Sequence, residues 1–146
     1  MEILISNRQA SQPIDLQALE HRVRRVLEGL ACAEGCELSL VLTDDPGIAV
    51  LNQDYLGRVG PTNVLAFPMG EGQFAELNPG LLGDVVVSVD TAWREAAGHG
   101  LDPGEHFMRL VIHGILHLLG HDHLQDEAQA LAMEELTERL LTQSAG

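Results

Sequence analysis

Four histidines stand close together in the segment HGILHLLGHDH (113–123). His113 and His117 are four residues apart, so on a helix their side chains lie one turn apart on the same face, where two imidazoles can share one metal ion. Gly120 favours a left-handed helix end, after which the chain can turn back and bring His123 to the same ion. Three histidine ligands with an open fourth position are typical of a catalytic zinc site.

The third ligand and the identity of the ion have alternatives. His121 would extend the stripe of the two helical histidines if the helix continued through Gly120, but the glycine favours His123. Asp122 would orient an imidazole from outside the coordination sphere or serve as a solvated turn residue. Three imidazoles accept Ni²⁺, Co²⁺ or Cu²⁺ as well as Zn²⁺, so the sequence predicts one divalent ion, with zinc as the first choice.

The histidine spacing also matches an extended metalloprotease pattern, H-x3-H-x2-G-x2-H, with one difference. Those proteases carry a glutamate general base directly after the first histidine, and this chain has Gly114 there. A metal-bound water can still act as a nucleophile without that glutamate, because the ion lowers the pKa of the water toward neutrality. The residues therefore predict a metal-dependent hydrolase and disfavour a peptidase.

The clearest helix start in the chain precedes these histidines. Asp102 is the predicted N-cap, Pro103 the first helical residue and Glu105 the partner in a capping box. This start predicts a helix that ends near Leu119. Such a helix would carry both histidines in its second half.

The remaining elements alternate along the chain. Hydrophobic periodicity and turn residues predict strands at 2–6, 37–43, 62–68 and 83–90 and further helices at 13–30, 44–57, 91–97 and 125–142. Prolines on both sides of the third strand favour an edge position, where a missing N–H does least harm. The expected architecture is a small sheet covered by helices, one layer of each, in a single domain spanning 1–146.

The composition limits the partners and the location. No run is apolar and long enough to span a membrane, and the N-terminus lacks the pattern of a signal peptide, so a cytoplasmic protein with no membrane contact is expected. Cys32 and Cys36 are spaced C-x3-C, unlike a redox or zinc motif, and are expected to be reduced structural residues. The formal net charge of −14 argues against nonspecific coating of nucleic acid, because that binding depends on clustered cations.

The run HGILHLLGHDH resembles the HGxLHLxGxDH signature of the YbeY family of endoribonucleases and rRNA maturation factors. The resemblance continues through LNQDYLGRVGPTNVLAFP (51–68) and LLGDVVVSVD (81–90). It implies an α+β fold with a small mixed four-stranded sheet and about five helices, and it places the metal ligands at His113, His117 and His123. It also implies cleavage of single-stranded RNA in rRNA maturation, notably of 16S rRNA at its 3′ end, beside the ribosome or small-subunit assembly proteins.

Two positions depart from the family pattern. Leu56 stands where the family commonly has an arginine implicated in function, and Ala66 replaces the usual serine. Arg58, two residues after Leu56, is the candidate for a phosphate contact, with a solvated loop arginine as the alternative. Turn or capping roles are favoured over site roles for three further polar residues: Thr62, Asn63 and Asp84.

Three functions are compatible with these observations. The leading hypothesis is a metal-dependent endoribonuclease, in which the histidines hold Zn²⁺ and a nearby arginine offsets developing negative charge. Because the chain is acidic, this hypothesis requires a local groove lined by arginines, expected among Arg22, Arg24, Arg25, Arg58 or Arg94. The alternatives are a metalloprotease-like peptidase and a non-catalytic, metal-stapled ribosome-assembly factor whose acidic last helix faces a protein.

Overall fold

The structure is a computed structural model that describes residues 1–32, 35–69, 81–120 and 126–145. Four strands form one sheet in the order β1-β2-β4-β3. Their bounds are β1 Glu2–Asn7, β2 Glu37–Thr43, β3 Val64–Pro68 and β4 Leu81–Ser88. The first, second and fourth strands run parallel, whereas β3 pairs antiparallel with β4 at the edge of the sheet. The α+β class, the mixed four-stranded sheet and the edge position of the proline-flanked strand are therefore confirmed.

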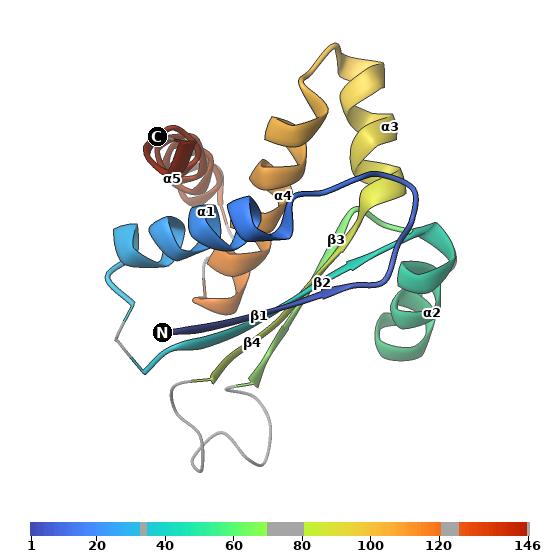
Figure 1. Ribbon diagram of the computed structural model, residues 1–146, viewed down its shortest axis with the longest axis horizontal. Coiled ribbons are helices and arrows are strands. Elements are labelled where there is room, and N and C mark those ends of the chain that lie inside the picture. The colour runs from blue at the N-terminus through green and yellow to red at the C-terminus, as the bar shows by residue number, and fades with distance from the viewer. Residues whose placement is uncertain (33–34, 70–80, 121–125, 146) are drawn as a thin grey trace.

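One face of the sheet carries the main core. The helices α1 (Leu16–Gly29) and α4 (Pro103–Leu118) pack on this face, and α5 (Glu127–Ala145) packs on both of them, as Figure 1 shows. Because side chains alternate along a strand, every second residue of β2 and β4 enters this core. The buried strand residues that contact the helices on this side are Leu38, Leu40, Leu42, Val85 and Val87.

The opposite face carries a smaller core beneath α2 (Asp45–Leu56). Ile48 of this helix is fully buried and packs with Leu65 of β3 and Val86 of β4. Half-buried Val41, Leu51 and Phe67 surround this cluster. A single helical layer was expected, and α2 adds a second, partial cover on the other face (Figure 1).

The junction between β4 and α3 (Val89–His99) lies two residues earlier than predicted. The strand ends at Ser88 because its hydroxyl caps the helix, accepting a hydrogen bond from the Thr91 N–H at 3.3 Å. The helix ends at Gly100, whose φ of 64° lies in the left-handed region that glycine adopts without strain. No helix among the described residues is long and apolar enough to cross a membrane.

The last helix extends beyond its predicted end at residue 142. Arg22 of α1 explains the extension, because its Nε donates to the Ser144 hydroxyl at 3.1 Å and its Nη2 to the Leu141 carbonyl at 2.9 Å. The same guanidinium forms a salt bridge with Glu105 of α4 at 2.8 Å. A tertiary contact thus holds a helix end that the local sequence does not mark.

Candidate metal centre

The α4 helix begins as the capping pattern predicts. The Asp102 carboxylate accepts a hydrogen bond from the Glu105 N–H at 3.0 Å, and Pro103 occupies the first helical position. At the other end, Gly120 has a φ of 93°, and its N–H donates to the His117 carbonyl at 3.1 Å. The predicted helix and its glycine terminus are therefore confirmed.

His113 and His117 converge on this helix. Their Nε2 atoms are 3.1 Å apart, with ring centroids at 4.7 Å and ring planes at 65°. Two imidazole nitrogens on one tetrahedral zinc ion, each about 2.0–2.1 Å from the metal, are about 3.3 Å apart. The pair therefore fits two adjacent ligands of one ion, and both histidines are half-buried.

The third ligand falls outside the described residues. His123, its alternative His121 and the neighbouring Asp122 all lie in 121–125. Within the described ranges, no group of three or more histidine, cysteine or acidic side chains could hold a metal ion. The described geometry consists of two converging imidazoles, and the assignment of His123 stays a prediction.

Gly114 explains why the protease glutamate is missing. A Cβ at this position would lie 2.6 Å from Val85 Cγ1 on β4 and 3.2 Å from Val64 Cγ2 on β3. The helix therefore approaches the sheet so closely that only glycine fits between them. A glutamate here would point into the sheet and break this packing, so the structure offers the usual peptidase base no room.

A half-buried polar network joins α4 to the start of the edge strand. The Glu95 carboxylate on α3 accepts hydrogen bonds from Asn63 Nδ2 at 3.3 Å and bonds His106 Nε2 at 3.0 Å. Asn63 also caps β3, because its Oδ1 accepts a hydrogen bond from the Val64 N–H at 2.7 Å. This contact agrees with the structural role favoured for Asn63. Sequence reasoning missed His106, although it precedes His113 by two helical turns on the same face.

Asp84 lies on the other side of the sheet from the histidines. Val85 packs against Gly114, and neighbouring strand residues point to opposite faces. The Asp84 side chain therefore points toward the α2 side, opposite Phe67 in the register of β3 and β4. Its position excludes a direct role at the histidine pair.

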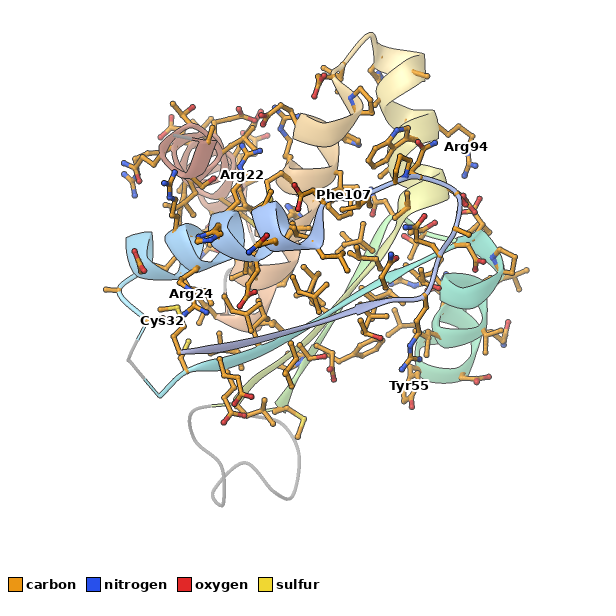
Figure 2. All side chains as sticks on the ribbon, in the orientation of Figure 1. Arg22, Arg24, Cys32, Tyr55, Arg94 and Phe107 are labelled. Carbon is orange, nitrogen blue, oxygen red and sulfur yellow. The ribbon has the colours of Figure 1, made fainter. Side chains whose placement is uncertain are left out.

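Four of the five arginines expected to group beside the metal site are bound to partners elsewhere in the fold. Arg22 and Arg25 both bond Ser144 at the interface of α1 and α5, and Arg94 pairs with Asp45 at 3.0 Å on the far side of α3. Figure 2 shows Arg22 beside α5 and Arg94 on the outside of α3. Arg24 bonds Glu20 and the Met1 carbonyl. Apart from the Arg24–Glu20 pair, these guanidinium groups bond carboxylate, carbonyl or hydroxyl oxygens on other elements, which spacing along the sequence does not reveal.

Arg58 differs from the other candidates. It follows the left-handed Gly57 that ends α2, and its N–H donates to the Asn52 carbonyl at 3.2 Å. Its side chain is exposed and forms no ion pair within the described residues. Arg58 is therefore free to meet an anionic ligand, although no contact among the described residues links it to the histidines.

The cysteines lie away from this site, where α1 ends and β2 begins. Cys36 is buried. The pKa of the Cys32 thiol is raised to about 12, first by the burial of Cys32 itself and then by a hydrogen bond and a charge interaction with Cys36. A thiol with such a pKa stays protonated near neutrality, so its nucleophilicity is low. This environment supports the structural role expected for both residues.

The fold and the histidine pair define a class of small α+β proteins in which one helix carries two converging histidines beside a sheet edge. Comparison with known proteins gives the family. The family model described as "Endoribonuclease YbeY" matches residues 4–145. Proteins named endoribonuclease YbeY from Geobacter sulfurreducens and Syntrophus aciditrophicus are 45% and 41% identical to this chain. These alignments cover 92% and 97% of this chain and 89% and 88% of the relatives.

The chain therefore belongs to the endoribonuclease YbeY family. A solution structure of a Thermotoga maritima protein has the same fold, with a TM-score of 0.67 over 97% of this chain and 88% of that one. Its sequence identity is 23%, so this likeness concerns the fold alone.

Proposed function

We propose that this protein is a metal-dependent endoribonuclease that cleaves single-stranded RNA. The convergence of two imidazoles on α4, in a chain that belongs to a family named for this activity, is the observation that supports it most directly. The proposed ion is Zn²⁺, with Ni²⁺ or another divalent metal as alternatives, and the proposed ligands are His113, His117 and His123. When bound, the ion would supply Lewis-acid polarisation of a phosphodiester oxygen and a more acidic water.

The chain's own residues have defined tasks in this proposal. His113 and His117 present Nε2 lone pairs from one rigid face of α4, so the ligand directions are set by the helix before an ion binds. Gly114 holds that face against β3 and β4. Arg58 is the proposed phosphate contact, since its guanidinium can form paired hydrogen bonds with two phosphate oxygens.

The cellular role follows from the family resemblance. We propose that the RNA substrate is ribosomal, that cleavage contributes to maturation of the 3′ end of 16S rRNA, and that the enzyme works in the cytoplasm with the ribosome or small-subunit assembly proteins. The acidic surface fits a partner-guided encounter better than binding driven by charge, because −14 formal charges repel free RNA.

The test combines elemental analysis of the purified protein with cleavage of single-stranded RNA by the wild type and by His117→Ala. We expect about one divalent ion per chain and cleavage that chelation abolishes. His117→Ala should lower the rate by about a hundredfold or more, because loss of even a ligand's supporting partner costs 10–100-fold. His99→Ala, an exposed histidine at the end of α3, is the matched control and should keep full activity.

The same preparations separate the alternatives. Cleavage of a peptide substrate that depends on the metal would favour the peptidase, which the packing of Gly114 opposes. A metal-stapled binding module predicts that His117→Ala lowers the melting temperature while neither protein cleaves RNA. That second result would contradict the proposed function.

A further inference from the structure

Exposed apolar side chains gather where α2 ends. Tyr55 is 68% exposed, Leu56 47% and Val59 92%, and the exposed Arg58 lies among them. We call these four residues the α2 patch. Figure 2 shows Tyr55 at the end of α2, on the outside of the molecule. Large apolar side chains that stay grouped and exposed commonly mark a binding site.

One side of the Tyr55 ring packs on Phe67. Its centroid lies 5.3 Å from that of Phe67 on β3, with the ring planes tilted by 56°. Phe67 is half-buried and belongs to the small core beneath α2, so it is a firm support. One side of the Tyr55 ring therefore rests on the protein while the rest faces solvent, which is the arrangement of a stacking platform.

The loop that carries Arg58 and Val59 is also fixed. The Gly57 N–H donates to the Gln53 carbonyl at 3.1 Å, and the buried Asn52 donates from its Nδ2 to the Gly60 carbonyl at 2.9 Å. These bonds fold residues 57–60 back against the end of α2. The side chains of the patch are consequently displayed on a preorganised surface, and a ligand would bind without ordering a loop first.

We propose that the α2 patch is a base-stacking subsite for single-stranded RNA, in which Tyr55 stacks on one base and Arg58 contacts the adjoining phosphate. The identity of the ligand rests on the proposed function. Exposed aromatic rings beside an unpaired arginine are the features by which proteins hold single strands without reading their sequence. A duplex cannot offer a free base face, so the subsite would select single-stranded RNA.

The position of the patch suits this ligand. Phe67 faces α2, whereas its neighbour Ala66 pairs with Val85, the residue against which Gly114 packs. The patch and the helix that bears the histidine pair therefore contact the same edge strand, β3, from opposite faces of the sheet. A single strand crossing this edge would reach both.

Size and charge favour RNA over a protein partner. Four side chains are enough for one base and one phosphate, whereas a standard protein interface uses about 20–30 residues on each side. Asp54 is exposed beside Tyr55 and offsets part of the charge of Arg58. Binding at the patch must therefore depend on stacking more than on charge, and the affinity should change with salt by a log–log slope of about one or less.

The experiment measures binding of a short fluorescein-labelled single-stranded RNA to the full chain, with EDTA present to prevent turnover. Tyr55→Ala should weaken Kd about tenfold or more, while Tyr55→Phe should stay within about twofold of the wild type, because phenylalanine keeps the ring. Leu131→Ala on α5, also an exposed apolar residue, is the matched control and should leave Kd unchanged. Equal thermal unfolding of all four proteins would show that the fold is intact.

A crosslink identifies the contact directly. RNA that contains 5-iodouridine should crosslink to the peptide with Tyr55, and the duplex of the same sequence should not. An unchanged Kd for Tyr55→Ala, or crosslinks confined to other segments, would overturn the subsite. A dimer in sedimentation that Tyr55→Ala disrupts would assign the patch to a second copy of the chain and would overturn it equally.

The result is separable from the proposed function. A wild type that cleaves RNA while binding is insensitive to Tyr55 retains the function and loses the subsite. A wild type that binds RNA through Tyr55 without cleaving it retains the subsite and loses the enzyme.

Discussion

The two faces of the sheet use the same strands in different ways. On the α4 face, residues such as Val85 and Val87 enter a large core that holds the histidine helix in place. On the α2 face, Val86 enters a small cluster with Ile48 and Leu65, and the side chains at the end of α2 remain exposed. The first face holds the histidine pair on a firmly packed helix, whereas the second displays the Tyr55 ring and the Arg58 guanidinium, because the shorter helix α2 covers less of the strand surface.

The largest expected effect compares the two cores. Ile115 and Ile48 are both fully buried, the first in the large core and the second in the small one. Ile115→Ala should cost about 3–5 kcal/mol of unfolding free energy and Ile48→Ala about 2–3 kcal/mol, because a small cluster near solvent relaxes into its cavity more easily. Urea denaturation measures both. A greater loss at Ile48 would show that the α2 face carries the stability of the fold.

The next effect tests the close contact of α4 with the sheet. Gly114→Ala should lower the unfolding free energy by about 1–3 kcal/mol, because the added Cβ would collide with Val85 and the packed core could accommodate it only by shifting. The metal affinity should fall as well, because the helix that aligns His113 and His117 must move.

Gly98 on α3 provides the control for this substitution. A Cβ there has no atom within 4 Å among the described residues, so Gly98→Ala should stabilise the protein by about 0.5–1 kcal/mol through helix propensity alone. A neutral result for both variants would contradict the claim that position 114 is restricted by packing.

The smallest effect concerns the junction of the α2 face with α3. Burial pushes the pKa of Asp45 upward, but hydrogen bonds from Thr91, Ser88 and Arg94 outweigh it and hold the pKa below its usual value. The carboxylate therefore stabilises the fold above the ordinary pKa of about 3.9, and this contribution is lost as the pH falls through the lower, folded pKa.

Asp45→Asn should consequently cost about 1–2 kcal/mol at pH 7, and its difference from the wild type should shrink as the solution is acidified. Urea titrations at several pH values measure this trend. Asp54→Asn, an exposed position on the same helix, should track the wild type throughout. A difference between Asp45→Asn and the wild type that persists in acid would indicate a cause other than the charge.

Local signals in the sequence determined the elements of this protein and the chemistry at the helix. The Asp102 cap, the Gly120 terminus and the four-residue spacing of His113 and His117 act within a turn or two of chain, so they could be predicted from neighbouring residues. The edge position of β3 could be predicted in the same way, because the missing N–H of each flanking proline is a local property of the chain.

Only the tertiary structure decided which side chains meet across elements. Arg22 and Arg94 pair with Glu105 and Asp45 on other helices. Glu95 of α3 bonds His106 of α4, and Val85 of β4 lies so close to Gly114 that a larger residue would not fit there. Such contacts depend on how helices rest on a twisted sheet, and sequence spacing alone carries no record of that packing.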